Sequence, residues 1–459
     1  MRALDELLQL RSGPVPTEEI VRTGSDPVLP TRFALGETAA DVHTAIGIAV
    51  NDLWEMATGR RQALAIDVGH AAATLRSYQY LDVGSDNTAR SWARQRGRQK
   101  MSTPHPTRDG RYFLPHMGLA HLAERIRRVL DCADDPDALI AAVARWDALA
   151  LEEAIAAVNG CGAMVRSEEE WLAHPQGQWL ASRPVLEITR VADSPPEPLP
   201  VSARPLGRLR VLDLTRILAG PTCARTLAEH GAEVLMVTAQ HLPQSDMFVV
   251  DTSHGKRSCF LDLDKPDEAD RLLALVRGAD VFSQGYRPGV MARRGLSPER
   301  LAALRPGIVY TSMNCYGFGG PFGERAGWEQ LAQTVTGIAD EHGRDRPTLL
   351  PAAACDYLTG YLAAYGTLLA LGLRARVGGS YHVQASLCQS GMLLQRQRRM
   401  DDVPMDIDIP QALIGQISLE TDTANGHLRH LGPVLGMAET KPRWELPSPR
   451  LGSHTADWT

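Results

Sequence analysis

The chain has 459 residues, of which 44% are hydrophobic and 22% are charged, so it is long enough for two to four domains and a sizeable core. Its net charge of −6 argues against the broad basic surface that binds nucleic acid or an anionic membrane. We therefore expect an ordinary globular protein with neither nucleic acid nor a membrane as a partner.

The seven cysteines are odd in number, widely scattered, and without a CxxC pair or metal-ligand spacing. No apolar run approaches the ~18 residues of a membrane-spanning helix. The start "MRALDELLQLRSG" has an acidic pair in place of the basic and then apolar pattern of a signal sequence. These features predict reduced cysteines and a cytoplasmic protein.

The N-terminal part of the chain predicts a helix, a turn and a strand. Apolar residues have helical spacing from Glu37 to Met56, and "TGRRQ" then leads into the strand-like "ALAIDV". A polar stretch at 84–110 predicts a linker. Helical patterns follow it as far as a proline-rich boundary at 194–207.

Strands and helices alternate after residue 205. In "RVLDLTRILAGPTCARTLAEHGAEVLMVT" (210–238), two apolar strands flank a helix that follows Gly220-Pro221 and ends at Gly231. The alternation continues for ~100 residues, which predicts an α/β fold with a doubly wound, Rossmann-like parallel sheet and ligands at the carboxyl ends of its strands. The predicted division of the chain is a helix-turn-strand segment packed on the large domain (1–90), a small α+β domain (91–200), the Rossmann-like domain (205–395) and an extended C-terminal segment (396–459).

Common cofactor and nucleophile motifs are missing from the sequence. No GxGxxG follows the first strand of the predicted sheet, no GK[ST] ends "GFGGPFG" (317–323), and no GxSxG elbow or catalytic-cysteine signature occurs. His105, His116 and His121 lie close in sequence, but no carboxylate or cysteine beside them completes a metal-ligand spacing. We expect no metal and no dinucleotide, and any nucleophile has to be a carboxylate.

Asp356 stands among small and apolar residues in "AAACDYLTGY" (352–361), where a helix is predicted to begin. As an N-cap, its side chain would accept amide hydrogens from the first turn, which is the more common arrangement. As a nucleophile, it would be kept ionised by the helix dipole in poorly solvated surroundings. The pattern of the residues alone leaves both interpretations open.

Five segments occur in the order "VLDLTRILAGPTCARTLAEHGAEVLMV", "GKRSCFLDLDKP", "ADVFSQGYRPGVMARRGL", "LRPGIVYTSMNCYGFGGPFGERAGWEQLAQTVTG" and "AAACDYLTGYLAAYGTLLALGLRARVGG". Together they cover roughly residues 205–395 and resemble CoA-transferase family III, the CaiB/BaiF family. This family contains formyl-CoA and carnitine-CoA transferases and α-methylacyl-CoA racemase. The resemblance implies the family III fold, coenzyme A bound as an acyl-CoA substrate, and Asp356 as the nucleophile.

The resemblance also implies the reaction. Asp356 would attack an acyl-CoA thioester to give a mixed anhydride and a CoA thiolate, which would return to form an aspartyl-CoA thioester. A carboxylic acid acceptor would then take the CoA. Backbone amides of the glycine-rich loop at Gly317 and Gly319 would stabilise the developing oxyanion. The residues that match the coenzyme A cleft of the family are Lys256, Tyr286, Arg287 and Arg293, with the guanidinium groups as phosphate ligands.

Two alternatives remain open. Racemases of this superfamily carry a His where this chain has Trp328, and an indole cannot move a proton, which favours a transferase over a racemase or isomerase. The other alternative is a non-catalytic CoA-binding paralogue, because Gly285 and Thr238 depart from the family pattern and the parts of the chain run in an unusual order.

The unusual order concerns the N-terminal ~200 residues, which resemble segments that follow the aspartate in the family. The chain therefore looks like the back half of one copy fused to the front half of another, and aligning "TGRRQALAIDV" with "VGGSYHVQASL" places Glu37 opposite Asp356. Glu37 is then a decayed nucleophile, a second carboxylate, or a first-turn glutamate favoured by the helix dipole. Because members of the family form interlocked dimers, we expect a homodimer.

Overall fold

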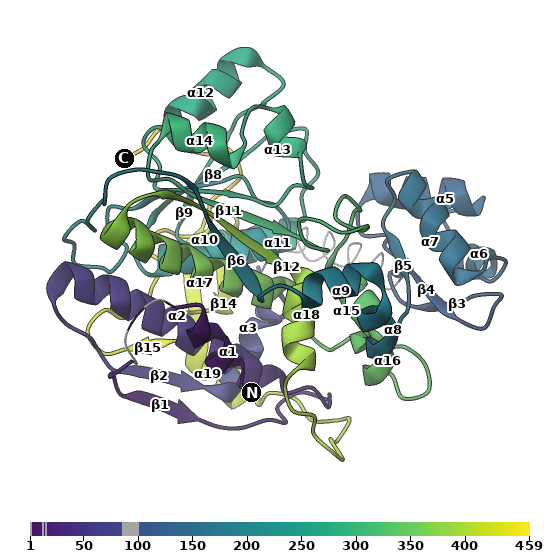
Figure 1. Ribbon diagram of the computed structural model, residues 1–459. Helices are drawn as coiled ribbons and strands as arrows, with labels where there is room; N and C mark the ends of the chain where they lie inside the picture. Colours follow the sequence, from purple (N-terminus) through teal and green to yellow (C-terminus); the bar gives the residue numbers. More distant parts are fainter. Residues whose placement is uncertain (1, 12, 14–15, 85–100) are drawn as a thin grey trace.

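The computed structural model describes residues 2–11, 13, 16–84 and 101–459. Most of the predicted linker (84–110) therefore lies outside the described residues. The described chain forms a large seven-stranded sheet with helices on both faces, a small α+β unit to one side, and an N-terminal layer below the sheet (Figure 1).

The large sheet has the strand order β6-β12-β11-β10-β7-β8-β9, and every strand except β6 runs parallel to its neighbours. The bounds are β6 Leu186–Ala192, β7 Arg210–Asp213, β8 Glu233–Thr238, β9 Lys256–Phe260, β10 Val281–Gln284, β11 Val309–Asn314 and β12 Ser380–Ser386. The chain builds outward from β7 through β8 and β9, and then crosses to β10 on the other side of β7. The strand order therefore reverses between β7 and β10, where doubly wound sheets bind ligands. This topology confirms the predicted α/β class.

Helices cover both faces of this sheet, with α12 and α14 on one face and α10 and α17 on the other (Figure 1). Because both faces are covered, five of the six residues of β8 are buried, and 234–237 read as a continuous apolar run. The helices of this part are α10 Ala219–Glu229, α11 Asp246–Thr252, α12 Pro266–Val276, α13 Val290–Arg293, α14 Pro298–Leu304, α15 Glu329–Thr336, α16 Ile338–His342, α17 Ala354–Val377 and α18 Leu387–Gln395.

The small unit has its own core and its own three-stranded antiparallel sheet. Its elements are β3 His105–Pro106, β4 Tyr112–Pro115, α5 Ala120–Leu130, α6 Pro136–Val143, α7 Ala148–Ala157 and β5 Gly162–Met164, and α8 Glu168–Ala173 and α9 Pro175–Ala181 lead back to the large sheet. The strand β6 belongs to the large sheet and not to the predicted small domain (91–200), because it pairs with β12. That pairing is a long-range contact, which a local pattern does not reveal.

The N-terminal layer combines the first part of the chain with residues 411–437, whereas the C-terminal residues lie against the large sheet and α12 (Figure 1). Its elements are α1 Ala3–Gln9, β1 Ile20–Thr23, α2 Leu35–Thr58, β2 Leu64–Asp67, α3 Val68–Thr74, the 3-10 helix η1 Ser77–Tyr80, α19 Gln411–Ile417, β13 Ser418–Thr423, β14 Gly426–Leu431 and β15 Gly436–Met437. The segment 396–459, predicted to be extended, thus contains a helix and the antiparallel hairpin β13–β14. The overlooked signal is Gly426, which directly follows the two-residue turn Ala424-Asn425 and has a φ of 112°, a conformation that favours glycine.

The helices α2 and α17 correspond to each other in several respects. Each has 24 residues, each packs on the other, and each is followed by a strand and a helix. Each also begins after an alanine of similar backbone conformation, with φ −75° and ψ 66° at Ala34 and φ −84° and ψ 59° at Ala353. The predicted helix Glu37–Met56 is confirmed, and it is one turn longer overall.

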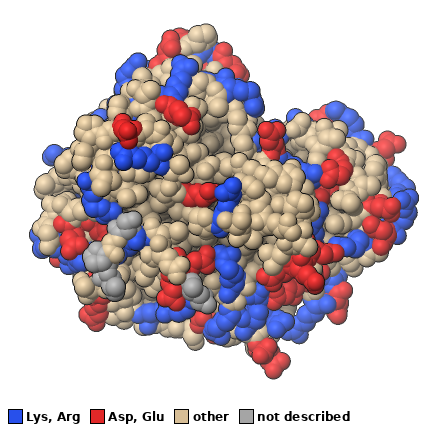
Figure 2. All heavy atoms as spheres, viewed as in Figure 1, with Lys and Arg blue, Asp and Glu red and all other residues tan. Residues whose placement is uncertain are grey.

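Acidic and basic side chains are interspersed over the face of the molecule in Figure 2, without a single-sign surface across it. Among the helices of the described residues, none combines the length and the apolar character that crossing a membrane requires. The cysteines of the described chain are all free thiols, and all but Cys132 are buried.

Candidate active site

Asp356 is the third residue of α17, in the first turn of the helix. The N-cap is Ala353, which makes no side-chain cap, and no described residue donates a hydrogen bond to the Asp356 carboxylate. Only 7% of Asp356 is exposed. The N-cap interpretation is therefore wrong, and a buried, unpaired carboxyl group lies at the positive end of a helix dipole.

Glu329, the first residue of α15, caps the N-terminus of α17 instead of Asp356. Its carboxylate accepts the amide N–H of Cys355 at 3.2 Å and the amide N–H of Asp356, and the Gln333 side chain donates to it at 2.5 Å. Burial raises the pKa of Glu329 to about 7. Burial first, and the charge of Glu329 second, raise the pKa of Asp356 well above its usual range. The two carboxyl groups therefore resist ionising together.

Two cavities meet at Asp356. The first has a volume of about 400 Å³ and the second of about 380 Å³. Leu119, Leu218 and Trp328 line both cavities and, with Asp356, form the boundary between them. A molecule that fills both cavities would therefore pass the Asp356 carboxyl group at this boundary.

The second cavity opens over the carboxyl ends of β7 and β10, where the strand order reverses. Arg216 follows β7, Arg287 follows β10, and Arg125 comes from α5 of the small unit. In the described part of the chain, none of the three pairs with a carboxylate: Arg287 donates to the Asn159 side chain at 2.7 Å, Arg125 to the Asn159 carbonyl at 2.9 Å, and Arg216 to a backbone carbonyl. Three cations without counter-ions suit a ligand that carries phosphates.

The predicted coenzyme A residues lie in different places. Tyr286 and Arg287 line the second cavity. Arg293 is exposed on α13, outside the wall of either cavity. Lys256 is fully buried, and its ammonium group donates to the carboxylate of Asp213 at 3.0 Å and to a carbonyl at 2.8 Å. The prediction for Lys256 is wrong because this lysine neutralises a core aspartate that sequence spacing does not reveal.

Gly317 and Gly319 do not face Asp356. A Cβ atom at these positions would lie 2.8 and 2.6 Å from the indole of Trp179 in α9. Neither glycine lines either cavity. These glycines allow the close approach of α9, so the cavity walls do not support an oxyanion role for this loop, which stays a prediction.

Four residues of the cavity walls were not predicted from the sequence: Arg125, Arg216, Asn159 and Glu329. Arg216 had a usable signal, because it lies three residues after Asp213, in the loop that leaves the first strand of the parallel sheet. Glu329 lies beside Trp328, within the segment 304–337, which resembles the family. Arg125 and Asn159 had no local signal, since the fold brings them to the cavity from a separate unit.

The histidines near residue 110 separate in the structure. His116 lines the first cavity and stacks on Trp328, with ring centroids 4.5 Å apart. Burial lowers the pKa of His116 to about 4, so its imidazole is neutral near pH 7. His121 lines the second cavity, whereas His105 lines neither.

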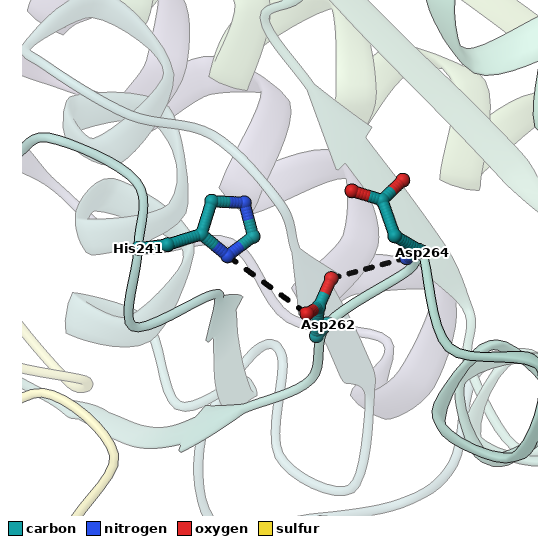
Figure 3. Close-up of side chains that lie close together, drawn as sticks. All are labelled: His241, Asp262 and Asp264. Carbon is teal, nitrogen blue, oxygen red and sulfur yellow. Dashed lines mark hydrogen bonds and ion pairs between the residues drawn. The ribbon is translucent and has the colours of Figure 1, made fainter.

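Figure 3 shows His241, Asp262 and Asp264, a group in the described chain whose ligand atoms lie within 4.8 Å of one another. Two local interactions account for the carboxylates. Asp262 accepts the amide N–H of Asp264 at 3.1 Å, as in a turn, and Asp264 pairs with Arg294 at 2.8 Å. The three side chains line neither of the two cavities, so we assign no metal to them.

Glu37, aligned with Asp356 in the sequence, lies in neither cavity. Its carboxylate forms a two-pronged ion pair with Arg398, at 2.8 and 2.9 Å. Asp26 accepts the amide N–H groups of Gly36 and Glu37 at 3.2 and 2.7 Å. Asp26 therefore accepts the amides at the start of α2 as Glu329 accepts those at the start of α17, but Glu37, unlike Asp356, is paired with an arginine.

Comparisons with known proteins agree with this architecture. Residues 206–411 match the model of CoA-transferase family III. The acetyl-coenzyme A transferase nodX of Hypoxylon pulicicidum is 33% identical over 307 residues, which are 61% of this chain and 52% of that protein. The beta subunit of succinyl-CoA–L-malate CoA-transferase of Chloroflexus aurantiacus is 32% identical over 203 residues, which are 40% of this chain and 50% of that protein. A crystal structure of a CAIB/BAIF family protein from Brucella suis is 28% identical, covers 49% of this chain and 65% of that chain, and gives a TM-score of 0.40.

The matched region contains the doubly wound sheet, the second cavity and Asp356. The chain spans about half the length of the curated relatives it matches, with 52% and 47% of the first two covered. Over residues 206–411, the chain is therefore similar to CoA-transferase family III.

Proposed function

We propose that this protein is a CoA-transferase that moves coenzyme A from an acyl-CoA donor to a carboxylic acid acceptor, with Asp356 as the nucleophile. The observation that carries the proposal is the position of Asp356 at the junction of two cavities, one of which is lined by three guanidinium groups without carboxylate partners. Coenzyme A carries phosphates at one end and a thioester at the other, so it matches this arrangement.

The proposed reaction exchanges the partners of one carboxyl group. An oxygen of ionised Asp356 forms a bond to the thioester carbonyl carbon, and the carbon–sulfur bond breaks to release the CoA thiolate. The thiolate then attacks the Asp356 acyl carbon of the mixed anhydride, which gives the aspartyl-CoA thioester and the free donor acid. The acceptor carboxylate repeats the two steps in reverse, so that Asp356 is regenerated and no proton is gained or lost.

The second cavity is the proposed coenzyme A cleft, with Arg125, Arg216 and Arg287 as phosphate ligands and Tyr286 in its wall. Guanidinium groups bind phosphate in a two-pronged geometry and stay charged at all working pH values. Their lack of carboxylate partners supports this role, because a paired arginine would have to give up an ion pair to bind the ligand.

Direct chemical trapping tests the proposal. The protein is incubated with acetyl-CoA and hydroxylamine, which attacks the acyl carbon of an activated Asp356 and leaves a hydroxamate there. We expect peptide mass spectrometry to find the hydroxamate at Asp356, and to find none in Asp356→Asn. Stoichiometric binding of acetyl-CoA without a hydroxamate would contradict the proposal and support a non-catalytic CoA-binding paralogue.

One observation favours an acyl-CoA racemase or isomerase as the second candidate. His116 brings a neutral imidazole to the wall of the first cavity, beside the Trp328 that stands where racemases of the superfamily carry a His. A neutral imidazole is able to accept a proton from the acyl α-carbon. Incorporation of deuterium at this carbon in heavy water, without transfer of CoA, would establish the racemase and overturn the transferase.

We further propose a homodimer in the cytoplasm as the working form. The interlocked dimers of the family support the oligomeric state, and the free thiols of the described cysteines support a reducing compartment. Light scattering on the purified protein measures the oligomeric state. A mass equal to that of a single chain would contradict the homodimer.

A further inference from the structure

The first cavity lies on the other side of Asp356 from the proposed coenzyme A cleft, so its wall decides which acyl groups reach the nucleophile. We call it the acyl cavity. Its volume of about 400 Å³ falls within the range of cavities that bind drug-sized ligands, and a formyl or acetyl group would leave most of it empty.

Large apolar side chains form much of the wall of the acyl cavity. Phe248 and Tyr78 meet edge to face with ring centroids 5.1 Å apart. The other large apolar members are Leu119, Leu218, Trp328, Leu349 and Leu350. Such a wall gains free energy by covering an uncharged hydrocarbon or aromatic tail.

The charges of the wall argue against an anionic tail. Among the described residues of the acyl cavity, Arg76 is the one arginine or lysine, and it is already engaged. Its guanidinium group pairs with the carboxylate of Asp408, donates to the Tyr80 hydroxyl at 2.7 Å, and lies over the Tyr80 ring at 5.2 Å. The other ionisable groups are neutral His116 and the carboxyl groups of Glu329 and Asp356.

Among the described residues of the wall, a second carboxylate would therefore lose water without gaining a free cation. Burying an unpaired charge costs several kcal/mol, whereas each buried methylene gains about 0.8 kcal/mol. The carboxylate that reacts is a different case, because it stays at the Asp356 end of the cavity, next to the amides at the start of α17.

We infer that the acyl cavity selects monocarboxylic substrates with an uncharged tail of medium length, and that it rejects dicarboxylic ones. The inference rests on the proposed function, since it names the substrate class of the same site. Donor and acceptor share the cavity in turn: the donor tail leaves as the free acid once the aspartyl-CoA thioester has formed, and the acceptor tail then enters.

The first test compares two CoA esters of similar length in the trapping experiment. Hexanoyl-CoA and succinyl-CoA differ mainly in the charge at the end of the tail. We expect the rate of CoA release per unit concentration, in the presence of hydroxylamine, to be at least tenfold higher for hexanoyl-CoA. Equal rates, or a preference for succinyl-CoA, would overturn the inference while leaving the transferase standing. Failure of every ester to label Asp356 would instead overturn the proposed function.

The second test places a cation in the wall. Leu349 is half-buried in the loop before α17, and its apolar side chain makes no hydrogen bond to Glu329 or Asp356, so Leu349→Lys adds charge without replacing a reacting group. We expect the ratio of succinyl-CoA to hexanoyl-CoA turnover to rise at least tenfold. An unchanged ratio would contradict the inference.

A matched control separates local charge from total charge. Val377, at the far end of α17 from Asp356, is 54% exposed, and the helix places it about 30 Å away along the axis. Val377→Lys carries the same added charge, so we expect it to keep the wild-type ratio. A shift in Val377→Lys equal to that in Leu349→Lys would overturn the claim that the cavity wall sets the preference.

Discussion

At the scale of single residues, two carboxyl groups lie at the start of α17 in different roles: Glu329 caps the helix, and Asp356 does not. Glu329 takes the amides of Cys355 and Asp356, which leaves the Asp356 carboxylate without hydrogen bonds from described residues. A carboxylate without such partners is less stabilised and therefore more nucleophilic once it is ionised. The same burial raises the pKa of Asp356. As the pH is lowered, Asp356 therefore becomes protonated, and loses its nucleophilic form, at a higher pH than an exposed aspartate would.

The substitution Glu329→Gln tests this coupling. It removes the neighbouring negative charge, which contributes to the raised pKa of Asp356, so the pKa of Asp356 falls. We expect the acid limb of the trapping rate to move to lower pH, measured as CoA release between pH 5 and 8. Glu341→Gln is the matched control, because Glu341 pairs with Arg399 and lines neither cavity. An acid limb that stays in place in Glu329→Gln would contradict the coupling.

The arginines of the second cavity allow a paired comparison. Arg287 lines the cavity, whereas Arg293 is exposed outside its wall. A hydrogen bond to a charged group contributes about 1.5–3 kcal/mol, so Arg287→Ala is expected to weaken binding of acetyl-CoA tenfold or more. Arg293→Ala should change the affinity less than twofold. Calorimetric titration measures both, and equal losses in the two variants would contradict the assigned cleft.

The sequence indicates some of these residues better than others. Asp356 is recognisable because its neighbours form a motif along one helix, and Tyr286 and Arg287 follow directly from a strand of the parallel sheet. Lys256 misleads because its partner Asp213 lies on another strand of the sheet. Contacts between distant segments decide whether a cation is free, and no local spacing records them.

At the scale of elements, α2 and α17 are two versions of one arrangement. In both helices a carboxylate from elsewhere in the chain accepts the two amides at the second and third helical positions, Asp26 for α2 and Glu329 for α17. In both, the third residue is acidic. The two acidic residues differ in their ion pairing. Arg398 pairs with Glu37 and keeps the pKa of that carboxyl group below its usual range.

This comparison predicts a structural and not a catalytic Glu37. Its ion pair is partly exposed, with 52% of the Arg398 side chain accessible, so Arg398→Ala is expected to cost at most about 1 kcal/mol of unfolding free energy. Asp26→Ala should cost more, about 1–2 kcal/mol, because it leaves two buried amides without an acceptor. Urea denaturation measures both. A hydroxamate at Glu37 in the trapping experiment, in either variant, would contradict a purely structural role.

Some helices and strands could be predicted from local sequence patterns, and others could not. The helix α2 and the unit β7-α10-β8 follow from apolar spacing and from glycine and proline at their ends, which act within one element. The edge strand β6 and the hairpin β13–β14 were missed for different reasons. β6 gains its place from pairing with β12, whereas the hairpin had a local turn signal in polar surroundings.

At the scale of the whole molecule, one chain supplies both walls of the proposed coenzyme A cleft. Arg216 and Arg287 come from the large sheet, whereas Arg125 and Asn159 come from the small unit. The hydrogen bond of 2.7 Å between Arg287 and Asn159 joins the two walls. Segments that lie far apart along the chain therefore line the same cavity, because the fold depends on which surfaces meet and not on their order along the chain.

Where the N-terminal layer meets α10 and α17, the core holds ionisable groups in their neutral forms. Burial lowers the pKa of His43 to about 3 and raises the pKa of Glu229 to about 8. His43 contacts the Thr74 hydroxyl at 3.2 Å, and its ring packs at a tilt of 53° against the Tyr361 ring, with centroids 4.4 Å apart. Low pH destabilises the fold through His43, which has to gain a proton to become charged. High pH destabilises it through Glu229, which has to lose one.

For His43 the unfolded chain binds a proton below pH 6.5 and the folded chain does not, so stability is lost as the pH falls from 6.5 toward 3. For Glu229 the folded chain keeps a proton that the unfolded chain loses, so stability is lost as the pH rises from 4.5 to 8. Urea denaturation from pH 5 to 7.5 measures both effects. Below pH 6, His43→Gln should change the slope of unfolding free energy against pH by about 1.4 kcal/mol per pH unit, and Glu229→Gln by a similar amount of opposite sign. Slopes that change in the same direction would contradict the neutral burial of the pair.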